Sequence, residues 1–112
     1  MEQQMIPRIL VVDDVEANRF SLRDIIHQAG YMPVLTENGM QALKVMERMA
    51  IDLVILDIAM PDMDGFEVCR RIKENVQTRE IPIIFSSALD KPEHIKQGFA
   101  CGGADYITKP FI

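Results

Sequence analysis

Hydrophobic residues along this chain alternate between short continuous runs and stretches with helical spacing. Residues 8–12 form a β-branched run that is apolar on both faces, which is typical of a strand buried in a parallel sheet. From Glu16 to Ala29 the apolar positions recur every three or four residues, and Gly30 stands where a helix is expected to end. This pattern predicts a strand followed by a helix.

The same unit repeats along the rest of the chain. Further strands are predicted at 31–36, 52–57, 82–85 and 106–108, and further helices after the Asn38-Gly39 turn, from the loop at 59–65 to about 75, and from about Lys91 to Cys101. Alternating strands and helices imply right-handed crossovers between parallel strands. The fold class is therefore α/β, a doubly wound parallel sheet with helices on both faces.

Polar residues follow the predicted strands, at the edge of the sheet where the carboxyl ends of the strands meet, which we call the rim. They are Asp13 and Asp14, Asp57, Ser86 and Ser87, and Lys109. Ligands of doubly wound sheets bind at this edge. Three crowded carboxylates repel one another unless a cation holds them, and oxygen ligands with open water positions favour Mg²⁺. The sequence therefore predicts a divalent-cation site at the rim.

The rim also has the groups that phosphoryl transfer needs. An ionised Asp57 beside a metal ion can attack phosphorus and form an acyl phosphate, while the metal and Lys109 neutralise the phosphoryl oxygens. A hydroxyl on the neighbouring strand, from Ser86 or Ser87, can then bond a phosphoryl oxygen and report the new charge.

Four motifs together resemble the receiver domains of bacterial two-component response regulators, over nearly the whole chain. They are Asp13-Asp14, the segment 56–65 (Leu-Asp-Ile-Ala-Met-Pro-Asp-Met-Asp-Gly), Ser87-Ala88, and the segment 106–111 (Tyr-Ile-Thr-Lys-Pro-Phe). The resemblance implies a flavodoxin-like sheet of five parallel strands in the order 2-1-3-4-5. It also implies a phosphoacceptor switch that is not an enzyme for other substrates, because it catalyses only its own phosphorylation and dephosphorylation.

The resemblance assigns roles at the rim. Asp57 is expected to receive the phosphoryl group from a sensor histidine kinase or a histidine phosphotransfer protein. Asp14 and Asp57 are expected to bind Mg²⁺ directly, with the backbone carbonyl of Ala59 as a third protein ligand and Asp13 acting mainly through water. Lys109 is expected to pair with the phosphoryl oxygens.

Two further positions resemble the switch residues of the family. Ser87 matches the switch hydroxyl better than Ser86, and Tyr106 matches the aromatic residue whose ring moves inward when that hydroxyl engages phosphate. An aromatic residue on a terminal strand also commonly packs in the core with its hydroxyl at the edge, so this alternative stays open. Asp62 and Asp64 are expected to shape the loop and cap the following helix rather than bind metal.

Composition excludes several classes of protein. The net charge is −5 and no run of Lys or Arg is present, which argues against direct nucleic-acid binding by this domain. No apolar run approaches the ~20 residues of a membrane helix. The start of the chain lacks a secretory signal, so we expect a cytoplasmic protein. Cys69 and Cys101 lack metal-site spacing and are expected to be buried thiols.

We expect residues 1–7 to form a flexible N-terminus and residues 8–112 to form a receiver domain that ends before its last helix. Receiver domains continue into a fifth helix, and its absence would leave an apolar sheet face bare. The chain is then a piece of a longer protein, a chain whose remaining part is missing, or a domain that covers this face as a homodimer. We favour the first, with an output domain beyond residue 112; otherwise a separate effector is the target.

Other functions remain to be separated from the phosphoacceptor switch. The main alternative is a docking module of the same fold that works without phosphorylation. An aspartyl phosphatase of the haloacid dehalogenase type needs Asp-x-Asp-x-Thr after its first strand, which residues 13–17 lack. A flavin carrier needs a hydroxyl- and glycine-rich phosphate loop at the same place, which is also absent.

Overall fold

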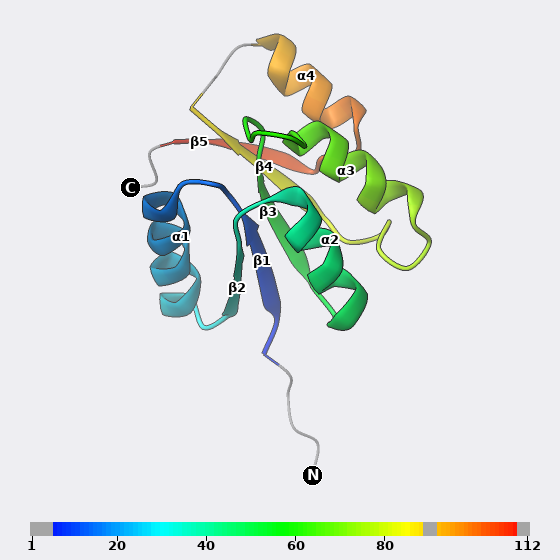
Figure 1. The fold of residues 1–112 in the computed structure, drawn as a ribbon. Helices are drawn as coiled ribbons and strands as arrows, with labels where there is room; N and C mark the ends of the chain where they lie inside the picture. The colour runs from blue at the N-terminus through cyan, green and yellow to red at the C-terminus, as the bar shows by residue number, and fades with distance from the viewer. Residues whose placement is uncertain (1–5, 89–91, 110–112) are drawn as a thin grey trace.

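A computed structural model describes residues 6–88 and 92–109 and shows strands and helices in strict alternation (Figure 1). The elements are β1 (Arg8–Val12), α1 (Glu16–Gln28), β2 (Met32–Thr36), α2 (Gly39–Arg48), β3 (Leu53–Asp57), α3 (Gly65–Glu74), β4 (Ile83–Ser87), α4 (Pro92–Ala100) and β5 (Asp105–Thr108). The predicted elements are confirmed in type and order, and their ends differ from the predicted ones by a few residues. None of the described helices combines the length and apolar character needed to cross a membrane.

The five strands form one parallel sheet in the order β2-β1-β3-β4-β5. This confirms the doubly wound, flavodoxin-like class and its strand order. Parts of three predictions lie outside the described residues: the flexible N-terminus over residues 1–5, the start of the fourth helix at Lys91, and the end of the last motif at Pro110 and Phe111.

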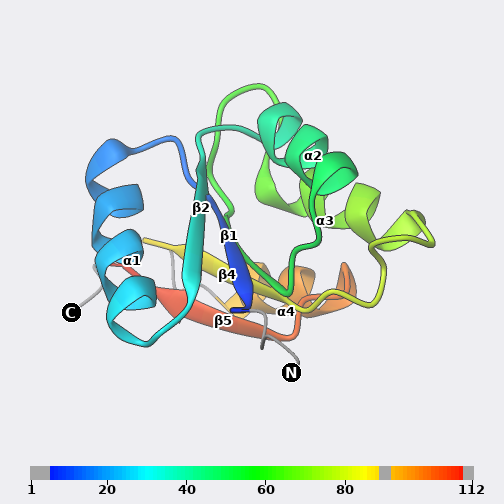
Figure 2. The same cartoon turned by 90° about the horizontal axis from the view of Figure 1, so that it is seen from below.

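The helices divide between the two faces of the sheet, with α2, α3 and α4 on one side and α1 on the other (Figure 2). The larger core cluster fills the side of α2 and α3, with fully buried residues from β1, β3 and β4, such as Leu10, Leu56 and Phe85. Strands β1 and β3 are apolar on both faces because residues of both core clusters cover them. The sheet is therefore a rigid support for the residues at its rim.

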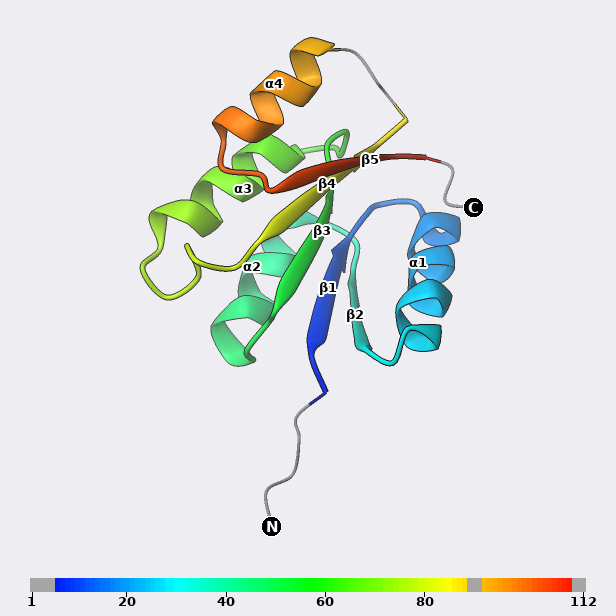
Figure 3. The ribbon, with the colours of Figure 1, turned by 180° about the vertical axis from the view of Figure 1, so that it is seen from behind.

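The face that α1 covers has a smaller core. Leu22 and Ile26 of α1 pack against Ile9, Val11 and Ile55. Helix α1 lies beside β1 and β2, and Figure 3 shows it away from β4 and β5. Among the described residues no other helix lies on this face of the sheet. Two apolar side chains on the same face, Ile84 of β4 and Ile107 of β5, are only partly buried.

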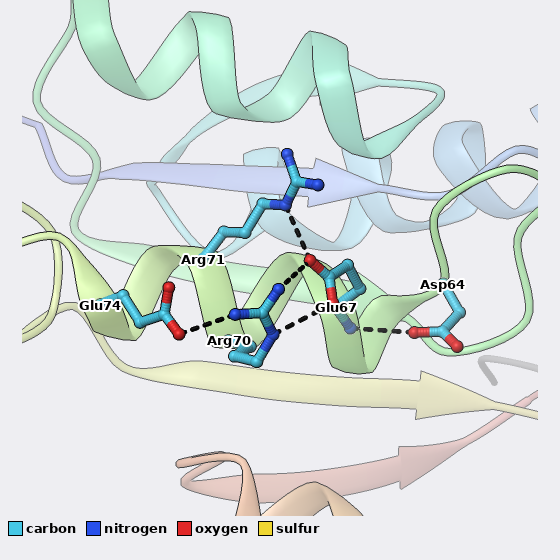
Figure 4. Close-up of polar contacts among 5 residues, drawn as sticks. All are labelled: Asp64, Glu67, Arg70, Arg71 and Glu74. Carbon is cyan, nitrogen blue, oxygen red and sulfur yellow. Dashed lines mark hydrogen bonds and ion pairs between the residues drawn. The ribbon is translucent and has the colours of Figure 1, made fainter.

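Helix α3 begins beside the loop that follows β3, and polar contacts determine where it begins (Figure 4). The Asp64 side chain caps the helix by accepting a hydrogen bond from the Glu67 backbone N–H at 2.9 Å, as predicted. Glu67 pairs with Arg70 and Arg71, and Arg70 pairs with Glu74 at 2.7 Å, all at the spacing of helix neighbours. The cap fixes the end of the loop between β3 and α3.

The two cysteines differ in burial. Cys69 of α3 is fully buried and its thiol donates to the Cys101 carbonyl oxygen at 3.1 Å. Burial raises the pKa of the Cys69 thiol to about 11, so the thiol stays protonated and inert. Cys101 directly follows α4 and is only half-buried, so the expectation of two buried thiols is right for Cys69 and wrong for Cys101.

Gly65, the first residue of α3, lies against the end of β3. Its backbone N–H donates to the Ile58 carbonyl oxygen at 2.9 Å. A Cβ atom at this position would lie 2.2 Å from the Asp57 carbonyl oxygen and 2.9 Å from the Ile58 Cα. Only glycine allows α3 to start this close to the end of β3.

We therefore expect Gly65→Ala to lower the free energy of unfolding by about 2–3 kcal/mol, because the atoms in the way belong to backbone that cannot rotate aside. Urea denaturation measures the change. Ser21→Ala, at an exposed position of α1, is the matched control and should stay within about 0.5 kcal/mol of the unsubstituted chain. A Gly65→Ala variant as stable as that control would contradict the close approach.

Candidate functional site

The ends of β1 and β3 bring the acidic residues together. Val12 pairs with Leu56 in the ladder, so Asp13 and Asp57 are the next residues on adjacent parallel strands. Both carboxylates are buried, with 0% and 2% exposure, whereas Asp14 is exposed. One oxygen from each of the three lies within 4.8 Å of the other two, close enough to hold one metal ion. The predicted acidic cluster is therefore present.

Lys109 reaches this cluster from the end of β5, on the far side of β4. Its ammonium lies 2.9 Å from Asp13 Oδ2 and donates to Asp57 Oδ1 at 3.0 Å. Its backbone N–H donates to the Ser87 carbonyl oxygen at 2.9 Å, which fixes the base of the side chain against β4. The structure thus brings Lys109 to both buried carboxylates at once.

The first turns of α1 hold Asp13 in place. Its Oδ1 accepts from the Val15 backbone N–H at 2.9 Å and from Asn18 Nδ2 at 3.4 Å. Its carbonyl oxygen accepts from the Arg19 guanidinium at 2.9 Å. The sequence does not identify Arg19, although an arginine six residues after a strand-end acid, in the first turn of a helix, is a signal that could have been used.

Burial and charge oppose each other at the rim. Burial raises the pKa of Asp57 to about 6, with repulsion from Asp13 and Asp14 adding to the effect and the hydrogen bond from Lys109 opposing it. Burial alone would lower the pKa of Lys109, but its bonds to Asp13 and Asp57 raise it overall. Lys109 is therefore a permanent cation, while Asp57 is ionised near neutral pH only at a cost.

The remaining predicted residues surround this cluster. Ser86 and Ser87 end β4 and are both buried, and Ala59 is exposed in the loop after β3. Tyr106 lies opposite Phe85 in the ladder and is half-buried against the larger core cluster. These positions agree with the sequence, but the switch roles of Ser87 and Tyr106 and the metal contact of Ala59 stay predictions.

The other loop acids lie outside the metal-binding group. Asp62 has a φ of 69°, a left-handed turn conformation that aspartate tolerates better than most residues. Asp64 caps α3. Both residues therefore shape the loop and the start of α3, as the sequence predicts.

The chain matches a known family over nearly its full length. The family model described as "Response regulator receiver domain" matches residues 9–112. The chain is 42% identical over 106 residues to "Response regulator PleD" of Caulobacter vibrioides, covering 95% of this chain and 23% of that protein. It is 35% identical over 105 residues to the "DNA-binding dual master transcriptional regulator RpaA" of Synechocystis, covering 94% and 44%.

Solved structures agree with this match. The chemotaxis protein CheY4 of Vibrio cholerae superposes with a TM-score of 0.92 at 29% sequence identity, over 96% of this chain and 90% of that chain. The chain spans less than half the length of the two curated relatives.

The raised pKa of Asp57 predicts a stability that depends on pH. Its pKa is about 6 in the folded chain and near 3.8 in the unfolded chain, so the folded state binds the proton more tightly. The contribution of Asp57 to the free energy of unfolding is therefore fully present below about pH 4. It is lost as the pH rises through about 6. Asp57→Asn, which carries no charge, should therefore be more stable than the unsubstituted chain at pH 8 without divalent cations.

We expect a gain of about 1 kcal/mol, because the uncharged amide avoids the cost of burying the Asp57 charge. Urea unfolding in a chelating buffer at pH 4 and pH 8 measures it, and the gain should vanish at pH 4. Asp62→Asn, in the exposed loop, serves as the control. Equal stability of the Asp57 variant and the unsubstituted chain at pH 8 would show that the folded structure does not penalise the Asp57 charge.

Proposed function

The chain belongs to the response regulator receiver domain family, and from that premise we propose that it is a phosphoacceptor switch with Asp57 as the acceptor. The donor is a phosphohistidine on a sensor histidine kinase or a histidine phosphotransfer protein. The observation that carries the proposal is the position of the buried Asp57 carboxylate between the Lys109 ammonium and the acidic pair of Asp13 and Asp14.

The chemistry follows from these groups. A carboxylate oxygen of Asp57 attacks the phosphorus atom, the P–N bond of the phosphohistidine breaks, and its electron pair returns to the imidazole. Lys109 bonds the phosphoryl oxygens and offsets their charge. Hydrolysis of the acyl phosphate by water resets Asp57, so the chain acts only on itself.

The donor set suits Mg²⁺, which prefers carboxylate and carbonyl oxygens and keeps several waters. Asp14, Asp57 and the backbone carbonyl of Ala59 would hold the ion directly. Asp13 would act through water, because its side-chain oxygens already contact Lys109, Val15 and Asn18. When bound, the ion supplies positive charge to the transferring phosphoryl group.

The output is proposed to lie at α4 and β5. Ser87 would bond a phosphoryl oxygen, and Tyr106, which already packs at the edge of the larger core, would move inward with it. Because the chain covers only part of its curated relatives, we propose that the target is an output domain of a longer protein or a separate effector. Pairing of two copies of the domain as a homodimer is a further proposed consequence of the change.

Asp57→Asn should abolish labelling of the chain by acetyl phosphate in the presence of Mg²⁺, because the amide cannot form the acyl phosphate. Phosphate-affinity gel electrophoresis or intact-mass measurement follows the added phosphoryl group. Asp62→Asn keeps the same change of charge in the neighbouring loop and should label at close to the normal rate. Labelling that persists in the Asp57 variant would assign the acceptor to another residue.

The docking-module alternative has one observation in its favour: Lys109 pairs with both buried carboxylates, so the chain itself balances part of their charge. Beryllofluoride, which mimics the phosphoryl group, separates the two functions. With Mg²⁺ it should shift the NMR signals of Tyr106 and of α4 in the switch. A titration that leaves Tyr106 unchanged while α4 still binds a partner would favour the docking module.

A further inference from the structure

The hydroxyl of Ser86 is buried without a hydrogen-bond partner. The residue is 1% exposed, and its Oγ contacts no donor or acceptor within hydrogen-bonding range in the part of the chain that the structure describes. The residues before it in β4, Ile84 and Phe85, are apolar. Buried hydroxyls are nearly always bonded, because an unpaired one has lost its water without replacement. A hydroxyl here therefore suggests a partner that appears in another state of the rim.

The position of Ser86 in the sheet indicates what that partner is. Ser86 pairs with Asp57 on one side and with Ile107 on the other, and paired residues of parallel strands share a face. Ile107 packs in the cluster on the α1 face, and Lys109, two residues later, returns to that face. Ser86 thus lies on β4, between the acceptor on β3 and the strand that carries the lysine.

The side chain of Lys109 has to cross β4 on this face to reach its partners. Its ammonium lies 3.0 Å from Asp57 Oδ1 and 2.9 Å from Asp13 Oδ2, although Lys109 itself follows β5. An ammonium has three N–H donors; one of them bonds Asp57 Oδ1, and Asp13 Oδ2 lies within ion-pair distance. A serine hydroxyl can take any of three staggered positions. The Ser86 oxygen is therefore beside the path of the lysine side chain.

We propose that Ser86 is a positioning residue for Lys109: with a divalent cation and a phosphoryl group at the rim, the Ser86 hydroxyl accepts a hydrogen bond from the Lys109 ammonium. The cation and the phosphoryl group engage the same carboxylate oxygens that hold Lys109 in the present structure. Lys109 then bonds the phosphoryl oxygens, and a further acceptor for its remaining N–H groups keeps the ammonium over Asp57. This inference rests on the proposed function, and it gives Ser86 a role separate from that of Ser87.

The test compares Ser86→Ala with the unsubstituted chain in beryllofluoride and Mg²⁺. Loss of one hydrogen bond to a charged group should weaken beryllofluoride binding by about tenfold. The ¹⁵N signal of the Lys109 side chain is the direct readout: on binding, the ammonium should become protected from exchange in the unsubstituted chain and remain exchangeable in Ser86→Ala. Ser86→Thr keeps the hydroxyl and should restore both the affinity and the protected signal.

A second measurement excludes simple damage to the fold. Without cation, Ser86→Ala should unfold at the same urea concentration as the unsubstituted chain or a higher one, because it removes an unpaired hydroxyl. The matched control is Thr78→Ala, which removes a buried hydroxyl that donates to the Ile72 carbonyl oxygen at 2.8 Å. That control should unfold at a lower urea concentration and bind beryllofluoride normally.

The outcomes separate the two proposals. If the unsubstituted chain does not bind beryllofluoride, the proposed function fails and the role of Ser86 with it. If it binds, and Ser86→Ala binds equally well with the same Lys109 signal, the role of Ser86 alone is overturned. Equal loss in Ser86→Ala and Ser86→Thr would also overturn it, because the hydroxyl would then not be the group that matters.

Discussion

The rim depends on one electrostatic constraint: three carboxylates lie close together, and one lysine pairs with only two of them. Asp13 and Asp57 both contact Lys109, and Asp14 adds a third negative charge within 4.8 Å. Like charges at this separation repel strongly where water is excluded, and one ammonium cannot neutralise all three. Burial raises the pKa of Asp57 to about 6, and repulsion from Asp13 and Asp14 adds to the effect. A site of this kind is incomplete without further positive charge, and the donor oxygens suit a divalent cation.

The fold keeps this repulsion from opening the site. Parallel strands end at one edge, so β1, β3 and β5 present Asp13, Asp57 and Lys109 there without any loop having to place them. The residues directly below, Val12 and Leu56, are fully buried and fix the strand ends. Asn18 of α1 and the Val15 backbone then hold the Asp13 carboxylate from the side. Rigid packing below the rim is what makes a crowded acidic cluster sustainable.

The sequence predicts most of this arrangement because its main signals are local. An apolar run followed by an acid identifies both the strand and the residue at its end, as for Asp13 and Asp57. Contacts between distant elements leave no such signal. Cys101 is half-buried because α4 ends directly before it, and Arg19 reaches Asp13 from a helix whose rotation the sequence does not determine. Ser86 and Ser87 are chemically equivalent in the sequence; only the register with β3 shows which of them lies in the row of Asp57.

The geometry of β5 connects the constraint at the rim to a distant surface. Lys109 follows this strand and turns to the face of the carboxylates, whereas Tyr106, three residues earlier, packs toward the larger core on the opposite face, the side of α4. As an edge strand, β5 has ladder partners only on β4, so it can shift without breaking a second ladder. In the proposed switch, a cation and a phosphoryl group free Lys109 from Asp13, and the strand that carries Lys109 is also the strand that carries Tyr106. A ligand shifts the equilibrium between two conformations only by the difference in its binding free energy for each of them. The exchange of partners by Lys109 supplies that difference between the unphosphorylated and phosphorylated forms.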